Sequence, residues 1–352
     1  MQLFDQKYRL YLILPIILYL VFAFNILVFP GIKQGIDLKG GTLIIVRSAQ
    51  AIDEARLESL LKTRFNLSEI SVTTTSSPTG YGATIEFEEN KNLAPIKKEL
   101  ALAQSLIDSN PAQARIHAMN VINALPKFVE GKIPIDAKET LDFAINVFDK
   151  AKIAFELELQ NSIQQELGLG NDSKFQLREI GASLGESFWG NAIVVTLAAM
   201  ILISIIVLIF FREIVPSFAI IAAAIFDIMC ALGLMSWFGV SLSLATIPAL
   251  LMLVGFSIDT DIMLTTRLLK RKENTPADRT REAFKTGITM TGTAIASVVI
   301  LLIASYFYQM VVVFQISSVL LFGLIGDIIS TWLMNAPVLL MYIEKKKGTV
   351  TA

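Results

Sequence analysis

Two carboxylates lie two residues apart inside a long apolar stretch of this chain. The stretch covers residues 244–266 and is followed by a basic residue, Arg267. An ionised side chain inside a bilayer costs on the order of 3 kcal/mol unless it faces a polar partner or water. Acids in such a place indicate ion binding or proton transfer, so Asp259 and Asp261 are the first candidate site residues.

The two acids face different sides of the predicted helix. At about 100° per residue, Asp261 shares a polar face with Ser257 and Thr265. Asp259 instead shares a face with Gly255. One acid can therefore line a polar path while the other faces a neighbouring helix, and we predict that the pair forms an ion-coupling site.

Two further acids interrupt other apolar stretches. Asp227 lies near the middle of residues 217–238, and Asp327 lies near the middle of residues 313–342. A buried acid can be structural, because it can stay protonated or cap a neighbouring helix. Four acids in three predicted spans nevertheless exceed what a passive anchor needs, so we predict that both contribute to ion coupling.

A polar stripe is predicted on the span at residues 286–306. Lys285, Thr289 and Thr293 recur every four residues and so share one helix face. Two structural alternatives stay open: a lysine at the end of a span can extend to the membrane surface, and a threonine stripe can be a close-packing face. As functional residues, the threonines would line the ion site and the lysine would gate it electrostatically.

The composition is that of a membrane protein. Hydrophobic residues make up 54% of the chain and charged residues 17%, and long runs this poor in charge are typical of membrane spans. The net charge of -1 argues against nucleic-acid binding, which needs a basic face. The single Cys230 excludes a disulfide framework, and the single His117 has no second ligand nearby. Because nucleotide-binding and hydrolase motifs are also absent, we predict no enzyme activity, no cofactor and no metal site.

The distribution of basic residues predicts the orientation in the cell membrane. Lys and Arg occur at the N-terminus, in residues 267–285 and in residues 343–352, and are absent from the links at 239–243 and 307–312. The positive-inside rule then places both termini in the cytoplasm and the large segment 31–187 outside. The first span lacks the features of a cleaved secretory signal, so we expect a retained anchor. The six predicted spans are residues 11–30, 188–211, 217–238, 244–266, 286–306 and 313–342.

The outer segment is predicted to be an α+β domain. Its order of strand, helix, two strands, helical region and strand is that of a ferredoxin-like split βαβ unit. Residues 31–91 and 172–182 would form the ferredoxin-like part, and residues 92–171 a helical insertion in place of its second helix. The predicted strands are residues 42–47, 69–75, 81–88 and 174–180, and the predicted helices are residues 51–65, 94–109, 112–128 and 137–167.

Four short motifs resemble those of a known family of membrane proteins. Residues 35–42, Gly-Ile-Asp-Leu-Lys-Gly-Gly-Thr, resemble the Gly-Ile-Asp-Phe-x-Gly-Gly-Thr signature of the SecF family. Residues 181–186 resemble its Val-Gly-Pro-x-Val-Gly-Glu element, and residues 226–228 its His-Asp-Val without the histidine. Residues 254–267 resemble its Val-Gly-Tyr-Ser-Ile-Asn-Asp-Thr motif. The resemblance covers the whole chain except residues 92–169, and the chain is more similar to archaeal members of the family than to bacterial ones. The resemblance implies that the family's motif residues in this sequence are Asp37, Gly40, Gly41, Gly255 and Ser257.

This resemblance implies a membrane subunit of the SecDF complex of the Sec protein translocase, within the resistance-nodulation-division superfamily. Such a subunit would couple proton or sodium movement to motion of its outer domain and so assist protein export. The implied partners are a SecD subunit, the Sec translocon channel, the translocating unfolded polypeptide and membrane lipid. The bacterial motif has its single acid at the position of Thr260, whereas the acid of SecD aligns with Asp259. Lys285 is the nearest match to an arginine in the family's fifth span.

Two other functions stay open at this point. The chain could be a scaffold that holds translocon subunits together, with acids that serve only helix packing. It could also be a small-molecule efflux subunit of the same superfamily, although a largely helical outer segment shows no pocket pattern.

Overall fold

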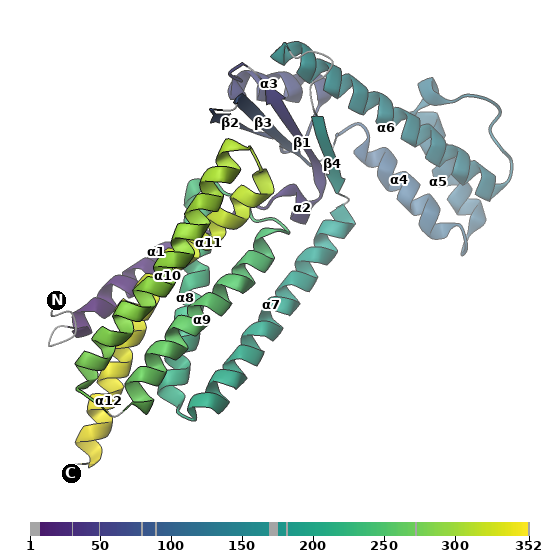
Figure 1. Cartoon of the computed structure of the whole chain (residues 1–352). Helices are drawn as coiled ribbons and strands as arrows, with labels where there is room; N and C mark the ends of the chain where they lie inside the picture. The colour runs from purple at the N-terminus through teal and green to yellow at the C-terminus, as the bar shows by residue number, and fades with distance from the viewer. Residues whose placement is uncertain are drawn as a thin grey trace. The chain divides into compact units, whose positions relative to one another are not determined.

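The chain folds as two compact units (Figure 1). One unit contains Met1–Lys39 and Ala182–Ala352, and the other contains Gly40–Gly181. Lys7, Pro30, residues 172–173 of the predicted ferredoxin-like part and Lys174 of the predicted closing strand lie outside the described residues. The computed structural model describes residues 8–29, 31–48, 50–78, 80–88, 90–168, 175–180, 182–271 and 273–350.

The first unit, here called the membrane unit, has six helical segments that are long and apolar enough to span a membrane, counted over the described residues. The prediction of six spans is thereby confirmed. The sixth changes from α-helix to a short π-helix and back within the apolar stretch. The spans are η1 with α1 (Tyr8–Leu12, Ile13–Leu27), α7 (Ala182–Phe211), α8 (Ile214–Phe238), α9 (Thr246–Lys270), α10 (Pro276–Phe307) and α11, η3 and α12 (Val311–Ile329, Ser330–Asn335, Ala336–Val350).

The spans differ in how much of their surface the membrane unit buries. Inside the unit, 56% of the apolar stretch of α8 is buried, compared with 6% for α7. Helices α8, α9 and α11 therefore form the centre, while α7 exposes apolar side chains such as Val194 and Ile201. Apolar exposure of this kind is expected for helices that contact lipid tails.

Glycines let the central helices approach closely. A Cβ atom on Gly323 of α11 would lie 2.0 Å from Leu253 Cδ2 of α9. A Cβ atom on Gly326, one turn later, would lie 2.8 Å from Cys230 Cβ of α8. Small residues at such crossings are typical of membrane helix packing, and here they bring three polar helix faces together.

The second unit, Gly40–Gly181, contains a four-stranded antiparallel sheet in the order β2-β3-β1-β4 (Figure 1). This order and the α+β class agree with the predicted ferredoxin-like domain. Helix α3 (Glu54–Phe65) connects β1 to β2 and buries Leu57 and Leu61 on the sheet. The strands are β1 (Gly41–Ser48), β2 (Ser71–Ser77), β3 (Gly80–Phe87) and β4 (Phe175–Ile180).

The helical region between β3 and β4 contributes to two cores. The C-terminal half of the long helix α6 packs Leu159 and Ile163 into the sheet core. Its N-terminal half packs Leu141 and Phe148 against α4 and α5. The second helix of the split βαβ unit is therefore present as part of α6, which corrects the expectation that the insertion replaces it. These helices are α4 (Ala94–Leu106), α5 (Pro111–Ala124), η2 (Pro126–Phe128) and α6 (Ala137–Leu167).

Two adjacent glycines make the turn into β1. Gly40 has φ +82° and Gly41 has φ +140°, and glycine adopts such positive values at little cost. A Cβ atom on Gly41 would also lie 2.5 Å from the carbonyl oxygen of Phe87. The pair is therefore required by backbone geometry at the start of the strand.

Candidate functional site

Three carboxylates are buried at the centre of the membrane unit. Asp227 comes from α8, Asp261 from α9 and Asp327 from α11, and none is more than 1% exposed. As the helical spacing predicts, Ser257, Asp261 and Thr265 all lie on the buried face of α9. The structure therefore places three of the four predicted acids in one polar core.

Asp227 accepts hydrogen bonds from two serines on different helices. Ser257 of α9 donates to its Oδ2 atom, and Ser330 of η3 donates to its Oδ1 atom over 2.7 Å. Both serines are fully buried. This carboxyl group thus links α8 to α9 and to the π-helical segment.

Thr331 lies between the other two acids. Its Oγ1 atom is 3.0 Å from Asp261 Oδ1 and 3.2 Å from Asp327 Oδ1. A hydroxyl group has one hydrogen, so Thr331 donates to one carboxylate at a time. The other carboxyl bonds to Thr331 only when it carries a proton and donates it to the hydroxyl oxygen. The arrangement makes the protonation states of Asp261 and Asp327 depend on each other.

Two further polar groups complete the contacts of these acids. Thr291 of α10 donates to Asp327 Oδ2 over 3.0 Å, and the Nδ2 group of Asn335 donates to Asp261 Oδ1 over 2.7 Å. In the described part of the chain, every side chain that hydrogen-bonds to the three acids carries a hydroxyl or an amide. Their charge is therefore balanced by protons or by a bound cation, since burial of an uncompensated carboxylate is very costly.

The π-helical segment η3 supplies three of these partners. Ser330, Thr331 and Asn335 all belong to it, and the N–H of Ala336 donates to the carbonyl oxygen of Thr331, five residues earlier. Short π-helical turns inside α-helices are rare and often mark functional sites. Here the widened turn carries the residues that bridge the acids of α8, α9 and α11.

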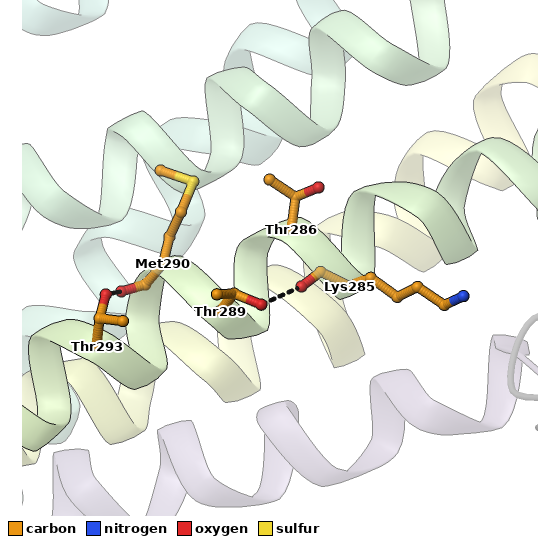
Figure 2. A pocket seen from close by; sticks show the side chains of 5 residues that line it. All are labelled: Lys285, Thr286, Thr289, Met290 and Thr293. Atoms are coloured by element: carbon orange, nitrogen blue, oxygen red, sulfur yellow. Dashed lines mark hydrogen bonds between the residues drawn. The ribbon is translucent and has the colours of Figure 1, made fainter.

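The other predicted site residues lie outside this cluster. Asp259 is exposed on the surface of the membrane unit, as is Gly255 on the same helix face. Lys285, Thr289 and Thr293 are also exposed, and they line an open hollow of about 490 Å³ along α10 (Figure 2). Within this chain, the stripe on α10 does not face the buried acids.

The hydroxyl hydrogens of the stripe are donated to its own helix. Thr289 donates to the carbonyl oxygen of Lys285, and Thr293 donates to that of Met290, each over 2.8 Å (Figure 2). The Lys285 side chain extends away from both threonines. A cation at this face would thus meet hydroxyl oxygens, whose lone pairs remain available.

Sequence reasoning missed four partners of the acids: Ser330, Thr331, Asn335 and Thr291. A signal was present for two of them, since Asp327, Thr331 and Asn335 recur every four residues, as the α10 stripe does. No such spacing points to Ser330, because the change to a π-helix alters which residues share a face.

His117, the single histidine, forms a surface pair in the second unit. Its Nδ1 atom lies 2.9 Å from Glu99 Oε2, and Asn120 donates to the same oxygen over 2.8 Å. The hydrogen bonds from Asn120 and His117 hold the pKa of Glu99 below its ordinary value. Among the described residues, no group of three or more His, Cys, Asp or Glu side chains is placed to hold a metal ion.

Comparisons with known proteins agree on one family. A family model described as "Protein export membrane protein SecD/SecF, C-terminal" matches residues 160–345, and one described as "SecD/SecF GG Motif" matches residues 26–52. The protein-export membrane protein SecF of Methanothermobacter thermautotrophicus is 32% identical over 92% of this chain and 89% of its own length. The SecF of Methanocaldococcus jannaschii is 32% identical over 97% of this chain and 98% of its own length.

A solved structure shares the fold. A crystal structure of SecDF, described as a translocon-associated membrane protein, from Thermus thermophilus has a TM-score of 0.58 at 13% identity. The match covers 97% of this chain and 59% of that chain. The glycine pair at the turn into β1 lies within the matched GG motif, which gives the motif a structural reason.

Proposed function

This chain belongs to the SecF family of protein-export membrane proteins, and from that premise we propose that it couples ion movement to protein export. It is a multi-pass membrane protein and not an enzyme. The coupling ion would be a proton or sodium, and binding would change the charge of the buried acid cluster. Moving one charge across a potential of 100 mV releases about 2.3 kcal/mol, which suffices to bias an equilibrium between two conformations.

One observation carries this proposal: the three buried acids are linked to one another through side chains of a single π-helical segment. Ser330 contacts Asp227, and Thr331 contacts both Asp261 and Asp327. Loading or unloading any one acid therefore changes hydrogen bonds made by η3. A change in η3 would move α12 and α11 relative to α8 and α9.

The orientation follows from the basic residues. Arg267, Lys270 and Arg271 cluster where α9 ends, and the guanidinium of Arg279 donates to the carbonyl oxygen of Leu268 over 2.7 Å. Under the positive-inside rule, this end of the membrane unit is cytoplasmic together with both termini. The unit Gly40–Gly181 is then extracytoplasmic, where it would handle the emerging polypeptide.

The exposed polar residues support a SecD-type partner. Asp259 and Lys285 lie on the surface of spans, and a charged side chain at membrane depth needs a polar partner or water. We assign this face, with Thr289 and Thr293, to contact with SecD and to the outer part of the ion path. The complex would in turn contact the translocon channel, the unfolded polypeptide and membrane lipid.

A scaffold function is the second candidate, because hydrogen bonds from three elements, α9, α10 and η3, already satisfy much of the acid cluster. Ser257, Thr291 and Ser330 each join two helical segments through a carboxyl group. Such contacts stabilise helix packing whether or not an ion moves. The two functions differ in what neutralisation of an acid does to export.

The test is export of a secreted reporter in cells that carry Asp227→Asn, Asp261→Asn or Asp327→Asn. The proton and sodium gradients are collapsed separately, and the abundance of the membrane complex is measured in each strain. Ion coupling predicts that export falls, and loses its gradient dependence, while the complex stays intact. A loss of export only in proportion to lost complex would instead support the scaffold.

A further inference from the structure

Three buried oxygen atoms beside Asp261 have no hydrogen-bond partner among the described residues. They are the Oδ2 atom of Asp261, the Oγ1 atom of Thr265 and the Oδ1 atom of Asn335. All three side chains are 0% exposed. Buried polar atoms are nearly always paired, so unpaired oxygens on neighbouring side chains indicate a binding partner for them.

These oxygens belong to groups that are already neighbours. Asn335 Nδ2 donates to Asp261 Oδ1 over 2.7 Å, so the two side chains are in direct contact. The unpaired atoms, Asp261 Oδ2 and Asn335 Oδ1, are the other oxygens of these same two groups. Thr265 follows Asp261 by one helical turn on the same buried face, about 6 Å along the axis. The Thr331 hydroxyl lies 3.0 Å from the other carboxylate oxygen of Asp261, Oδ1.

The chemistry of the three groups fits a small hard cation. A carboxylate, a hydroxyl and an amide carbonyl all offer an oxygen atom as a ligand, and oxygen ligands bind hard cations. The set carries a single negative charge. A cation of charge +1 would neutralise it, whereas a divalent ion would leave a net charge buried in the membrane unit.

The helix break supports the same assignment. Coupling-ion sites in membrane transporters typically occur where a spanning helix departs from α-helical geometry near the middle of the membrane. Asn335 is the last residue of the π-helical segment η3, which interrupts the sixth span. Among the three acids, Asp261 alone combines this break with unpaired oxygens.

We propose that Asp261, Thr265 and Asn335 form a binding site for a monovalent cation, with sodium as the ion. This inference rests on the proposed function and deepens it, because it names the ion and the residues that hold it. A proton on Asp261 would satisfy one oxygen through one O–H bond. A sodium ion at this site would take ligands from all three side chains.

The site also explains the role of Thr331. A bound cation keeps Asp261 ionised without a proton, so the Thr331 hydrogen can turn to Asp327 and stabilise its charged form. Sodium binding at one acid thereby changes proton binding at the next. The carboxyl groups that face this region are Asp227 from α8 and Asp327 from α11.

The test uses the purified full-length chain in detergent. Its thermal unfolding is followed at fixed pH and ionic strength while choline chloride is replaced by sodium chloride or by potassium chloride. We expect sodium to raise the melting temperature in a saturable way and choline to have no effect. Asp261→Asn, Thr265→Val and Asn335→Leu should each raise the half-saturating sodium concentration by about tenfold or more, because the first removes the negative charge of the site and the other two each remove an oxygen ligand.

Thr260→Val is the matched control. Thr260 is a buried threonine on the same helix, but its hydroxyl donates to the carbonyl oxygen of Phe256. The variant should keep the sodium response of the original chain. A sodium response that survives in all three site variants would overturn the proposal. A sodium response that is lost in Thr260→Val to the same extent as in the site variants would also overturn it.

Direct measurement of sodium binding to the original chain tests the site even if the variants fail to fold. Binding of radioactive sodium to the original chain should saturate and should be unaffected by an equal concentration of potassium. No saturable binding would overturn the site. If binding is absent while export still depends on the proton gradient, the proposed function stands and this site fails. If binding is present while export ignores both gradients, the proposed function fails.

Discussion

At the scale of single residues, one hydrogen atom links two acids. The Thr331 hydroxyl is within hydrogen-bond distance of both Asp261 and Asp327, but it donates to one at a time. Neutral hydrogen bonds of this kind contribute about 1 kcal/mol each, and a buried acceptor left without its donor costs about 1–3 kcal/mol. The position of this hydrogen therefore follows the charge of the two carboxyl groups.

Thr331→Val tests this link, because valine has nearly the shape of threonine without the hydroxyl. We expect the free energy of unfolding in detergent to fall by about 1–3 kcal/mol and export to lose its gradient dependence. Thr331→Ser keeps the hydroxyl and should restore the gradient dependence. If the valine variant exports with an unchanged gradient dependence, Thr331 does not connect the acids.

At the scale of elements, glycine and the π-helical turn act together. Gly323 and Gly326 let α11 approach α9 and α8, and η3 then turns its polar side chains toward all three acids. A Cβ atom on Gly326 would lie 3.3 Å from Asp227 Oδ1 as well as 2.8 Å from Cys230 Cβ. The close approach is therefore part of the site and not only of the packing.

Gly326→Ala should push α11 away from α8. Overpacking of a tight contact typically costs about 1–3 kcal/mol, so the melting temperature of the purified chain should fall. Gly292→Ala on α10 is the matched control, because no atom lies within 4 Å of its added Cβ. That control should be neutral or slightly stabilising, since alanine favours a helix over glycine. Equal effects of the two substitutions would contradict the packing argument.

At the scale of the whole molecule, the chain divides into a membrane unit and an α+β unit with separate cores. Ile44, Leu57 and Ile163 belong to the sheet core, whereas Leu253 and Leu324 belong to a core between spans. Each core is built from its own unit, so damage to one should leave the other's packing intact. The ion coupling that we propose depends on this division, because a change in the membrane unit could then move a separately folded domain.

Gly41→Ala should loosen the sheet of the second unit alone. Its φ of +140° disfavours alanine, and its Cβ would lie 2.5 Å from the Phe87 carbonyl oxygen. Hydrogen exchange measured by mass spectrometry on the full chain should become faster in β1, β3 and β4 and stay unchanged in α8 and α9. Gly131→Ala is the control for the same substitution outside the sheet, because Gly131 also has a positive φ, lies between η2 and α6 and has nothing within 4 Å of its Cβ. Its effect on the sheet should be absent.

Much of the fold could be predicted because its signals are local. Apolar stretches, basic links and strand-forming segments identify six spans and a split βαβ order without any long-range contact. The same local periodicity places Ser257, Asp261 and Thr265 on one face. It also indicates that α6 is helical, but not that Leu159 and Ile163 return to the sheet.

The order of residues alone thus establishes which side chains are polar within each span and which of them share a helix face. Which faces meet depends on helix packing, that is, on contacts between residues far apart in the chain. This packing turned Asp261 toward Asp327 and Asn335, and left Asp259 and Lys285 on the surface. The π-helical turn at Ser330–Asn335 changes the helical period that sequence reasoning assumes, which is why the residues joining the acids could be recognised only from the fold.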